Sequence, residues 1–442
     1  MRRLVVISSF PPRGKTHHKS VIGGASYTKN TLIALRKEAA LRDTPVHITV
    51  LAQKIAGEPT TSEDEGITVK RLWKRNSLST FNNLYKEISA NHKQTKDILI
   101  ELELNIFGNS SVFLGLLIPF LLALKTMGKN VTLVIHEVIY DMGKFGPHIN
   151  VKEKSIKTTF LNFGLGNFYR TLLLSVNRAI VFEESLKSRL SDITGKHNKI
   201  TVIPIAVENL PQRNSKANAR KELGIAEKDF VVMTFGFLAW YKGTDWLANA
   251  WPELEVSKEI KVPKVSNAKK PFDTSDTSSP FDTFRLIIAG GPNPNRIELP
   301  YYKKYLKDLS IVANEKDITL TGFVPEERMH LYFEASDVVV FPYRTMMSSS
   351  AVLSLAFSYE LPFLLSENMR PVFASPDIRE ELLSSNLTES DVLFPLDNTF
   401  MEKLEKLKKT PEKLEKMTQF SKKMKEKRSW ELISKKYYET IF

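Results

Sequence analysis

Short apolar runs alternate with longer amphipathic stretches along most of the chain. Runs of this length and composition are typical of buried parallel strands, and the stretches between them of helices that cover a sheet. The runs lie at 4–7, 47–51, 98–102, 131–135, 179–182 and 200–203, and again at 231–235, 286–289, 318–320, 338–341 and 363–365. The alternation predicts an α/β protein with doubly wound parallel sheets.

A polar, turn-rich segment at 203–220 interrupts the pattern, which then starts again. The sequence therefore predicts two units of this kind, one after the other. We expect a first domain at 1–205 and a second at 206–428. Four residues of the last segment, 429–442, fall at helical spacing, so this segment should pack back on the first domain as an amphipathic helix. They are Trp430, Ile433, Tyr437 and Ile441.

Two segments depart from the alternation. The stretch 257–283 is rich in Ser, Lys, Asp and Pro without an apolar period, and it predicts a flexible surface insertion. The most hydrophobic stretch, 112–124, is shorter than the roughly 20 residues that span a bilayer and contains Pro119, so we expect a buried helix. The first residues lack a long apolar run, which disfavours a secretory signal.

The stretch 346–360, MMSSSAVLSLAFSYE, lies between two of the apolar runs. Its residues Val352, Leu355, Ala356 and Tyr359 share one helical face. Ser348, Ser349 and Ser350 would then lie at a helix N-terminus on the carboxyl edge of a sheet, where free N–H groups bind anions. A phosphate site is predicted, and simple capping of the helix by a serine is the alternative.

Composition narrows the class of partner. The 442 residues carry a formal net charge of +13, which favours anionic partners such as nucleotides or an anionic membrane surface. The charge is spread over Lys/Glu-mixed segments without a reading motif, which disfavours nucleic acid. The absence of cysteine excludes disulfides and thiol nucleophiles and suits the cytoplasm.

Candidate ligand-binding residues follow the predicted strands. Gly23 and Gly24 directly precede a helix, so the backbone there could approach a phosphate closely; a plain flexible turn is the alternative. In the second unit Gly236 ends a strand, and Lys242 precedes a helix where it would add a full positive charge. Together with the three serines, these residues predict a cleft that holds a diphosphate between the two domains.

Candidate catalytic residues lie at the strand ends of the first unit. His136 and Glu137 end one strand and Glu103 ends another, so all three would lie at the edge where α/β sheets carry their sites. A histidine there could bond a substrate hydroxyl, and a carboxylate could accept or orient a proton.

These motifs, taken as a series, resemble the GT-B glycosyltransferases of family 4 over nearly the whole chain. In chain order they are SFPP, GG, ELELNIFG, VIHEV, VIPIAV, FGFLAWYKG, LIIAGGP, LTGFVPEERMHLYFEASDVVVFPYR and SSSAVLSLAFSYELPFLLS. The resemblance implies two Rossmann-like domains around a cleft and a C-terminal crossover helix. It also implies transfer of a hexose, of mannose or glucose type, from a UDP- or GDP-type sugar to a glycan or lipid-linked acceptor. Such transfer retains the anomeric configuration and uses no metal and no cofactor.

The resemblance also assigns roles to residues. Gly23 and Gly24 would face the donor phosphates, His136 would lie beside the transferred sugar, and Lys242 would bind the diphosphate. Val324 would contact the base through its backbone. Glu103 resembles a strand-end glutamate on the acceptor side.

Three positions depart from the pattern of that family. Phe237 stands where an arginine is frequent, and Met347 and Leu355 stand where a pair of glutamates is usual, as in branches that carry a serine turn instead. These departures keep two alternatives open. One is a non-catalytic subunit that binds a partner, and the other is a nucleotide-sugar epimerase or hydrolase on the same fold.

A basic and aromatic segment in the first unit predicts peripheral attachment to the inner face of a membrane. A helix packed within the domain, with its lysines in solvent, is the alternative. The segment comprises Lys152, Lys154, Lys157, Phe160, Phe163, Phe168 and Tyr169.

Overall fold

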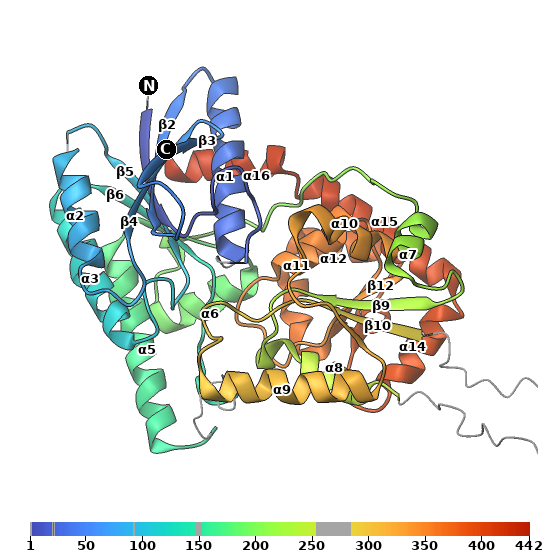
Figure 1. Cartoon of the computed structure of the whole chain (residues 1–442). Helices are drawn as coiled ribbons and strands as arrows, with labels where there is room; N and C mark the ends of the chain where they lie inside the picture. The colour runs from blue at the N-terminus through green and yellow to red at the C-terminus, as the bar shows by residue number, and fades with distance from the viewer. Residues whose placement is uncertain (1, 20, 22, 92, 146–152, 253–283) are drawn as a thin grey trace, which may run out of the picture.

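Two α/β domains, each built around its own sheet, form the structure, which is a computed structural model (Figure 1). It describes residues 2–19, 21, 23–91, 93–145, 153–252 and 284–442. The insertion expected at 257–283 and Lys152 lie outside the described residues. The α/β class and the two parallel sheets predicted from the sequence are confirmed.

The first sheet has eight strands in the order β3-β4-β2-β1-β5-β6-β7-β8. Neighbouring strands run parallel except β3, which pairs with β4 in the antiparallel sense. The strands are β1 (Arg2–Ser8), β2 (Val46–Gln53), β3 (Thr61–Asp64), β4 (Ile67–Trp73), β5 (Asp97–Leu102), β6 (Asn130–Ile135), β7 (Arg178–Val181) and β8 (Ile200–Val202).

Helices cover both faces of this sheet. One face packs on α2 (Thr80–Ala90), α3 (Ser111–Thr126), α5 (Ile156–Ser175) and α6 (Glu184–Thr194). The other face packs on α1 (Gly23–Leu41) and on the last helix, α16 (Trp430–Ile441). Short 3-10 helices lie at η1 (Gly143–Phe145) and η2 (His197–Lys199).

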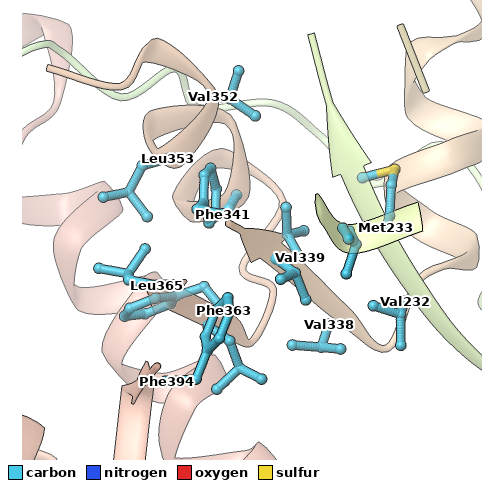
Figure 2. Packing of buried hydrophobic residues seen from close by; sticks show 14 of the residues in the cluster. Val232, Met233, Val338, Val339, Phe341, Val352, Leu353, Phe363, Leu365 and Phe394 are labelled. Carbon is cyan, nitrogen blue, oxygen red and sulfur yellow. The ribbon is translucent and has the colours of Figure 1, made fainter. Parts of the chain in front are cut away.

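The second sheet has six parallel strands in the order β11-β10-β9-β12-β13-β14. They are β9 (Phe230–Phe235), β10 (Phe284–Ala289), β11 (Thr319–Leu320), β12 (Val338–Phe341), β13 (Phe363–Ser366) and β14 (Leu393–Phe394). Figure 2 shows apolar side chains of these strands, such as Val339, Phe341 and Phe363, in one buried cluster with Leu353 of the helix between β12 and β13.

The helices of the second domain surround this sheet (Figure 1). They are α7 (Lys216–Leu223), η3 (Trp240–Lys242), α8 (Thr244–Ala250), α9 (Pro300–Glu315), α10 (Glu326–Ala335), α11 (Ala351–Ser358), η4 (Glu367–Ala374), α12 (Pro376–Ser384), α13 (Glu389–Val392), α14 (Phe400–Lys408) and α15 (Pro411–Lys427).

The crossover of the last helix joins the two domains. Val207 donates its N–H to the carbonyl of Arg428 at 2.7 Å and forms a parallel bridge with Ser429, so the two connecting segments lie side by side. From there α16 packs along α1, and Tyr437 lies fully buried with its hydroxyl 3.0 Å from that of Tyr27. The domain limits at 205 and 428 stay a prediction.

Every strand expected from an apolar run is present, and three further strands had no such run: β3, β4 and β14. In β4, buried Ile67, Val69, Arg71 and Trp73 alternate with less buried residues, which is the period of a strand with one solvated face. Strand β3 is a polar edge strand and β14 spans two residues, so neither carries a continuous apolar signal.

The prediction that 112–124 is a buried helix is only half right. Helix α3 buries Leu117, Leu121 and Leu124, but Val112 and Leu122 are exposed. Within the part of the chain that the structure describes, no helix is long and apolar enough to cross a membrane.

Candidate active site

A cavity of about 340 Å³ lies between the two domains. Strand order reverses beside β1 in the first sheet and beside β9 in the second, which are the crevices where open α/β sheets bind ligands. The loops after β1, β5, β6, β9 and β12 all contribute to the cavity. Of the residues singled out in the sequence, it is lined by Gly24, Glu103, His136, Glu137, Gly236, Lys242, Val324, Ser348, Ser349 and Ser350. Gly23 is the first residue of α1.

Lys242 provides the positive charge of the cavity on the side of the second domain. Gly236 has φ +106°, which only glycine adopts without strain, and a Cβ there would lie 2.9 Å from Lys242 Nζ. Burial lowers the pKa of Lys242 to about 8, so the ammonium form still prevails at neutral pH. No hydrogen-bond acceptor for Nζ is found among the described residues. A cation in this position is matched by an anionic ligand group.

The serine turn faces the cavity but is also held by protein contacts. Ser350 caps α11 by accepting a hydrogen bond from Leu353 N–H at 3.3 Å. Ser349 Oγ donates to Glu183 of the first domain at 2.6 Å. Ser348 forms an antiparallel bridge with Glu137. Ser350 therefore has the helix-capping role that was the alternative to phosphate binding. The backbone of the turn also pairs with the first domain, through the bridge between Ser348 and Glu137.

Glu183 is a buried carboxylate that no sequence motif indicated. It begins α6 and accepts hydrogen bonds from Ser349 and, at 2.9 Å, from Ser375 Oγ at the start of α12. Burial raises its pKa, although Arg428 and the two hydroxyls oppose this shift. Glu183 therefore connects the serine turn, the first domain and α12 at one point.

His136, Glu103 and Glu137 line the opposite wall, and Glu101 lies behind His136. Glu101, inside β5, is 2% exposed, and its Oε2 lies 2.6 Å from His136 Nε2. Burial lowers the pKa of His136, but the hydrogen bond and charge of Glu101, together with the charges of Glu103 and Glu137, outweigh it, and the net shift is upward. The imidazole is thus held by Glu101 and favoured in its charged form.

The pKa values of Glu103 and Glu137 are both raised. Burial raises the pKa of Glu103 to about 7, against the opposing charge of His136. Burial also raises the pKa of Glu137, whose Oε1 accepts a hydrogen bond from Leu104 N–H at 2.8 Å. Groups of this kind can hold or release a proton near neutral pH.

Gly24 lets the start of α1 approach this wall. A Cβ on Gly24 would collide with the Glu103 carboxylate and would lie 3.3 Å from His136 Cε1. A side chain at this position would therefore displace the Glu103 carboxylate.

The loop before α1 contacts the second domain. His17 and His18 both line the cavity. The N–H groups of Thr16 and His17 donate to Glu326 Oε2 of the second domain, at 3.1 and 2.9 Å. The loop therefore bridges the two domains at the cavity entrance.

Apolar side chains occupy the three positions where the family pattern has charged ones. Phe237, Met347 and Leu355 all line the cavity, as does Val324, which is 5% exposed. Glu101 and Glu183, in contrast, were missed in the sequence; a carboxylate inside an apolar strand was the available signal for Glu101.

The comparisons with known proteins agree with this architecture. Residues 229–382 match the family model for glycosyl transferases group 1. No curated protein matches the chain. Sucrose-phosphate synthase from Thermosynechococcus elongatus has a similar structure, with a TM-score of 0.68 and 15% identity over 99% of this chain and 98% of that one.

Two further solved structures share the fold over the full length. HepE from Anabaena, in complex with UDP, has a TM-score of 0.59 and 14% identity over 100% of this chain and 99% of that chain. WaaG, a glycosyltransferase involved in lipopolysaccharide biosynthesis, has a TM-score of 0.58 and 12% identity over 99% of each chain. Residues 229–382 thus match the glycosyl transferases group 1 model, and the whole chain shares the two-domain fold of these three solved structures.

Proposed function

We propose that the protein transfers a hexose, of mannose or glucose type, from a UDP- or GDP-type sugar to a glycan or lipid-linked acceptor. The transfer retains the anomeric configuration and needs no metal. The observation that carries the proposal is Lys242, whose ammonium group faces the cavity beside Gly236 without a carboxylate partner among the described residues.

The proposed chemistry divides between the two walls of the cavity. As the bond between the sugar C1 and the diphosphate oxygen breaks, negative charge grows on the leaving nucleotide, and Lys242 stabilises it. The acceptor hydroxyl forms the new bond to C1, and its proton passes to the departing diphosphate oxygen. His136 and Glu137 orient the reacting sugar or acceptor, and Glu103 contacts the acceptor side.

Two further observations favour a donor in this cavity. Gly24 brings the start of α1 against His136, so backbone N–H groups of the first domain are available to the donor. HepE has been solved with UDP and with UDP-glucose, which favours a uridine donor. We place the reaction in the cytoplasm, in keeping with a chain that contains no cysteine.

A product assay tests this proposal and separates it from its rivals. The protein is incubated with UDP- and GDP-hexoses in EDTA, with and without extracted lipids and polysaccharides, and nucleoside diphosphate release and sugar incorporation are followed. Release that needs an acceptor, with sugar incorporated, is the expected result. Release without an acceptor indicates a hydrolase, sugar isomerisation indicates an epimerase, and binding without turnover indicates a non-catalytic subunit.

A further inference from the structure

Exposed apolar side chains gather on two neighbouring helices of the first domain. Ile156, Phe160 and Phe163 of α5 are 78%, 71% and 67% exposed. Their spacing of four and three residues puts them on one face of the helix. Further exposed apolar residues on α3 and α5 are Val112, Leu122, Leu161 and Leu174. We call these seven residues the α3–α5 patch.

The patch is concentrated rather than scattered. It contains seven of the fifteen exposed large hydrophobic residues found in the described part of the chain. Single exposed apolar residues are ordinary, but several of them on two helices that pack together mark a surface that contacts something else. Figure 1 shows the N-terminal turns of α5 extending beyond the rest of the first domain.

The charged side chains on α3 and α5 are all positive. Neither α3 nor α5 contains an Asp or Glu, whereas Lys125, Lys157 and Arg170 lie on them. Lys154, just before α5, is exposed as well, next to the one carboxylate of Glu153. Aromatic and aliphatic side chains flanked by lysines fit an anionic lipid surface, because the apolar groups enter the acyl boundary while the cations contact headgroups.

The structure corrects the extent of the segment expected to lie on a membrane. Tyr169 is fully buried and Phe168 packs against the domain core, so neither belongs to the surface. Along α5, Ile156, Phe160 and Phe163 of the first two turns are exposed, whereas Leu172 and Leu173 near its end are buried and anchor the helix.

Helix α5 contacts the chain segment that follows Glu137 of the cavity wall. Tyr169 Oη accepts a hydrogen bond from Ile139 N–H at 3.1 Å, two residues after Glu137. Asn162 Oδ1 accepts one from Met142 N–H at 2.7 Å. A molecule held at the first two turns of α5 would thus be connected, through this one helix, to the cavity wall that contains Glu137.

We propose that the α3–α5 patch attaches the protein to an anionic bilayer and presents a lipid-linked acceptor to the cavity. The second part rests on the proposed function, whereas attachment does not. The surface binds the bilayer through the first two turns of α5, with the lysines contacting anionic headgroups.

Vesicle co-sedimentation of the full chain tests the attachment. Phosphatidylglycerol/phosphatidylcholine vesicles are compared with pure phosphatidylcholine at low and high salt. We expect binding to the anionic vesicles that weakens with salt, and a loss of about tenfold in the double variant Phe160→Ser/Phe163→Ser. Leu383→Ser is the matched control, since Leu383 is 71% exposed on the other domain, and it should bind like the parent.

Charge reversal and sedimentation velocity complete the test. Lys154→Glu/Lys157→Glu should weaken binding to the anionic vesicles only. Absence of vesicle binding by the parent, or unchanged binding by the phenylalanine variant, would overturn the proposal. A parent dimer that the phenylalanine variant turns into a monomer, without vesicle binding, would also overturn it by assigning the patch to a second copy. Nucleotide binding, measured on the same variants, should be unchanged and reports separately on the donor site.

Discussion

At the scale of single residues, the candidate site rests on buried groups whose protonation is set by burial and by neighbouring charges. Glu101 has almost no contact with solvent, and its carboxylate is placed against His136 Nε2. We interpret Glu101 as a positioning residue that fixes the ring and favours its charged form, so that Cε1 faces Gly24 across the cavity wall.

Glu101→Gln tests this interpretation. Removal of the carboxylate charge should lower the pKa of His136 by about one unit or more, because an adjacent opposite charge stabilises imidazolium by that amount. The shift is measured by NMR titration of the histidine Cε1 protons. Glu63→Gln, an exposed carboxylate of the same domain, is the control, and an equal pKa in both variants would contradict the interpretation.

Glu103 makes a prediction about stability against pH. Its folded-state pKa is raised from 4.5 to about 7 by burial, so the folded protein binds a proton that the unfolded chain releases between these values. This contribution to stability is complete below pH 4.5 and is lost as pH rises through 7.

The neutral variant Glu103→Gln should remove that dependence. Relative to the parent, its free energy of unfolding should rise between pH 5 and pH 8 by at most about 3 kcal/mol. Urea unfolding at the two pH values measures the difference. A parent and variant with parallel pH dependence would show that Glu103 is ionised in the folded state at pH 5.

At the scale of elements, the loop between β12 and α11 is held by contacts to both domains. Ser349 bonds to Glu183, Arg189 donates to the carbonyl of Met346 at 2.6 Å, and Val138 N–H donates to Met347 at 2.9 Å. The loop that faces the donor cavity is therefore positioned in part by the first domain.

Comparison of alanine variants of Ser349 and Ser348 distinguishes the loss of the Ser349–Glu183 hydrogen bond from the loss of a serine hydroxyl as such. Ser349→Ala should destabilise the protein by roughly 1.5 to 3 kcal/mol, because the bond reaches a buried carboxylate. Ser348→Ala should change stability by less than about 0.5 kcal/mol, since no partner for its hydroxyl is found among the described residues. Equal losses in urea unfolding would argue against the Glu183 contact.

The elements show which parts of the structure the sequence could predict. Continuous apolar runs such as 131–135 and 338–341 became strands β6 and β12, because buried parallel strands need no polar face. Strand β4 was missed since it alternates, with buried Arg71 donating to the carbonyls of Phe10 and Pro11 at 3.2 and 2.6 Å.

The site was predictable where a residue ends a strand. His136, Glu137, Gly236 and Ser348 all follow strands, and the topology brings them to one cavity. Glu183 was not predictable, because its partners Ser349 and Ser375 come from distant parts of the chain. Pairings of this kind depend on how the two domains pack together, which no local pattern contains.

At the scale of the whole molecule, the cavity exists because two separate units face each other. Glu326 accepts hydrogen bonds from two N–H groups of the loop before α1, and Glu183 accepts one from the hydroxyl of Ser349. Helix α16 crosses from the second domain and packs on the first. The opposing walls then carry different chemistry, with Lys242 on one and the His136 cluster on the other.

The most direct test of the central claim is isothermal titration of the purified protein with UDP, GDP, ADP and TDP and their hexoses in EDTA. We expect one base to bind selectively, and Lys242→Ala to weaken binding about tenfold or more, because a charge-assisted contact is lost. Lys304→Ala, which alters a lysine that is 76% exposed in the same domain, should bind like the parent. No binding at millimolar ligand, or equal affinity in the parent and Lys242→Ala, would contradict a donor site at this cavity.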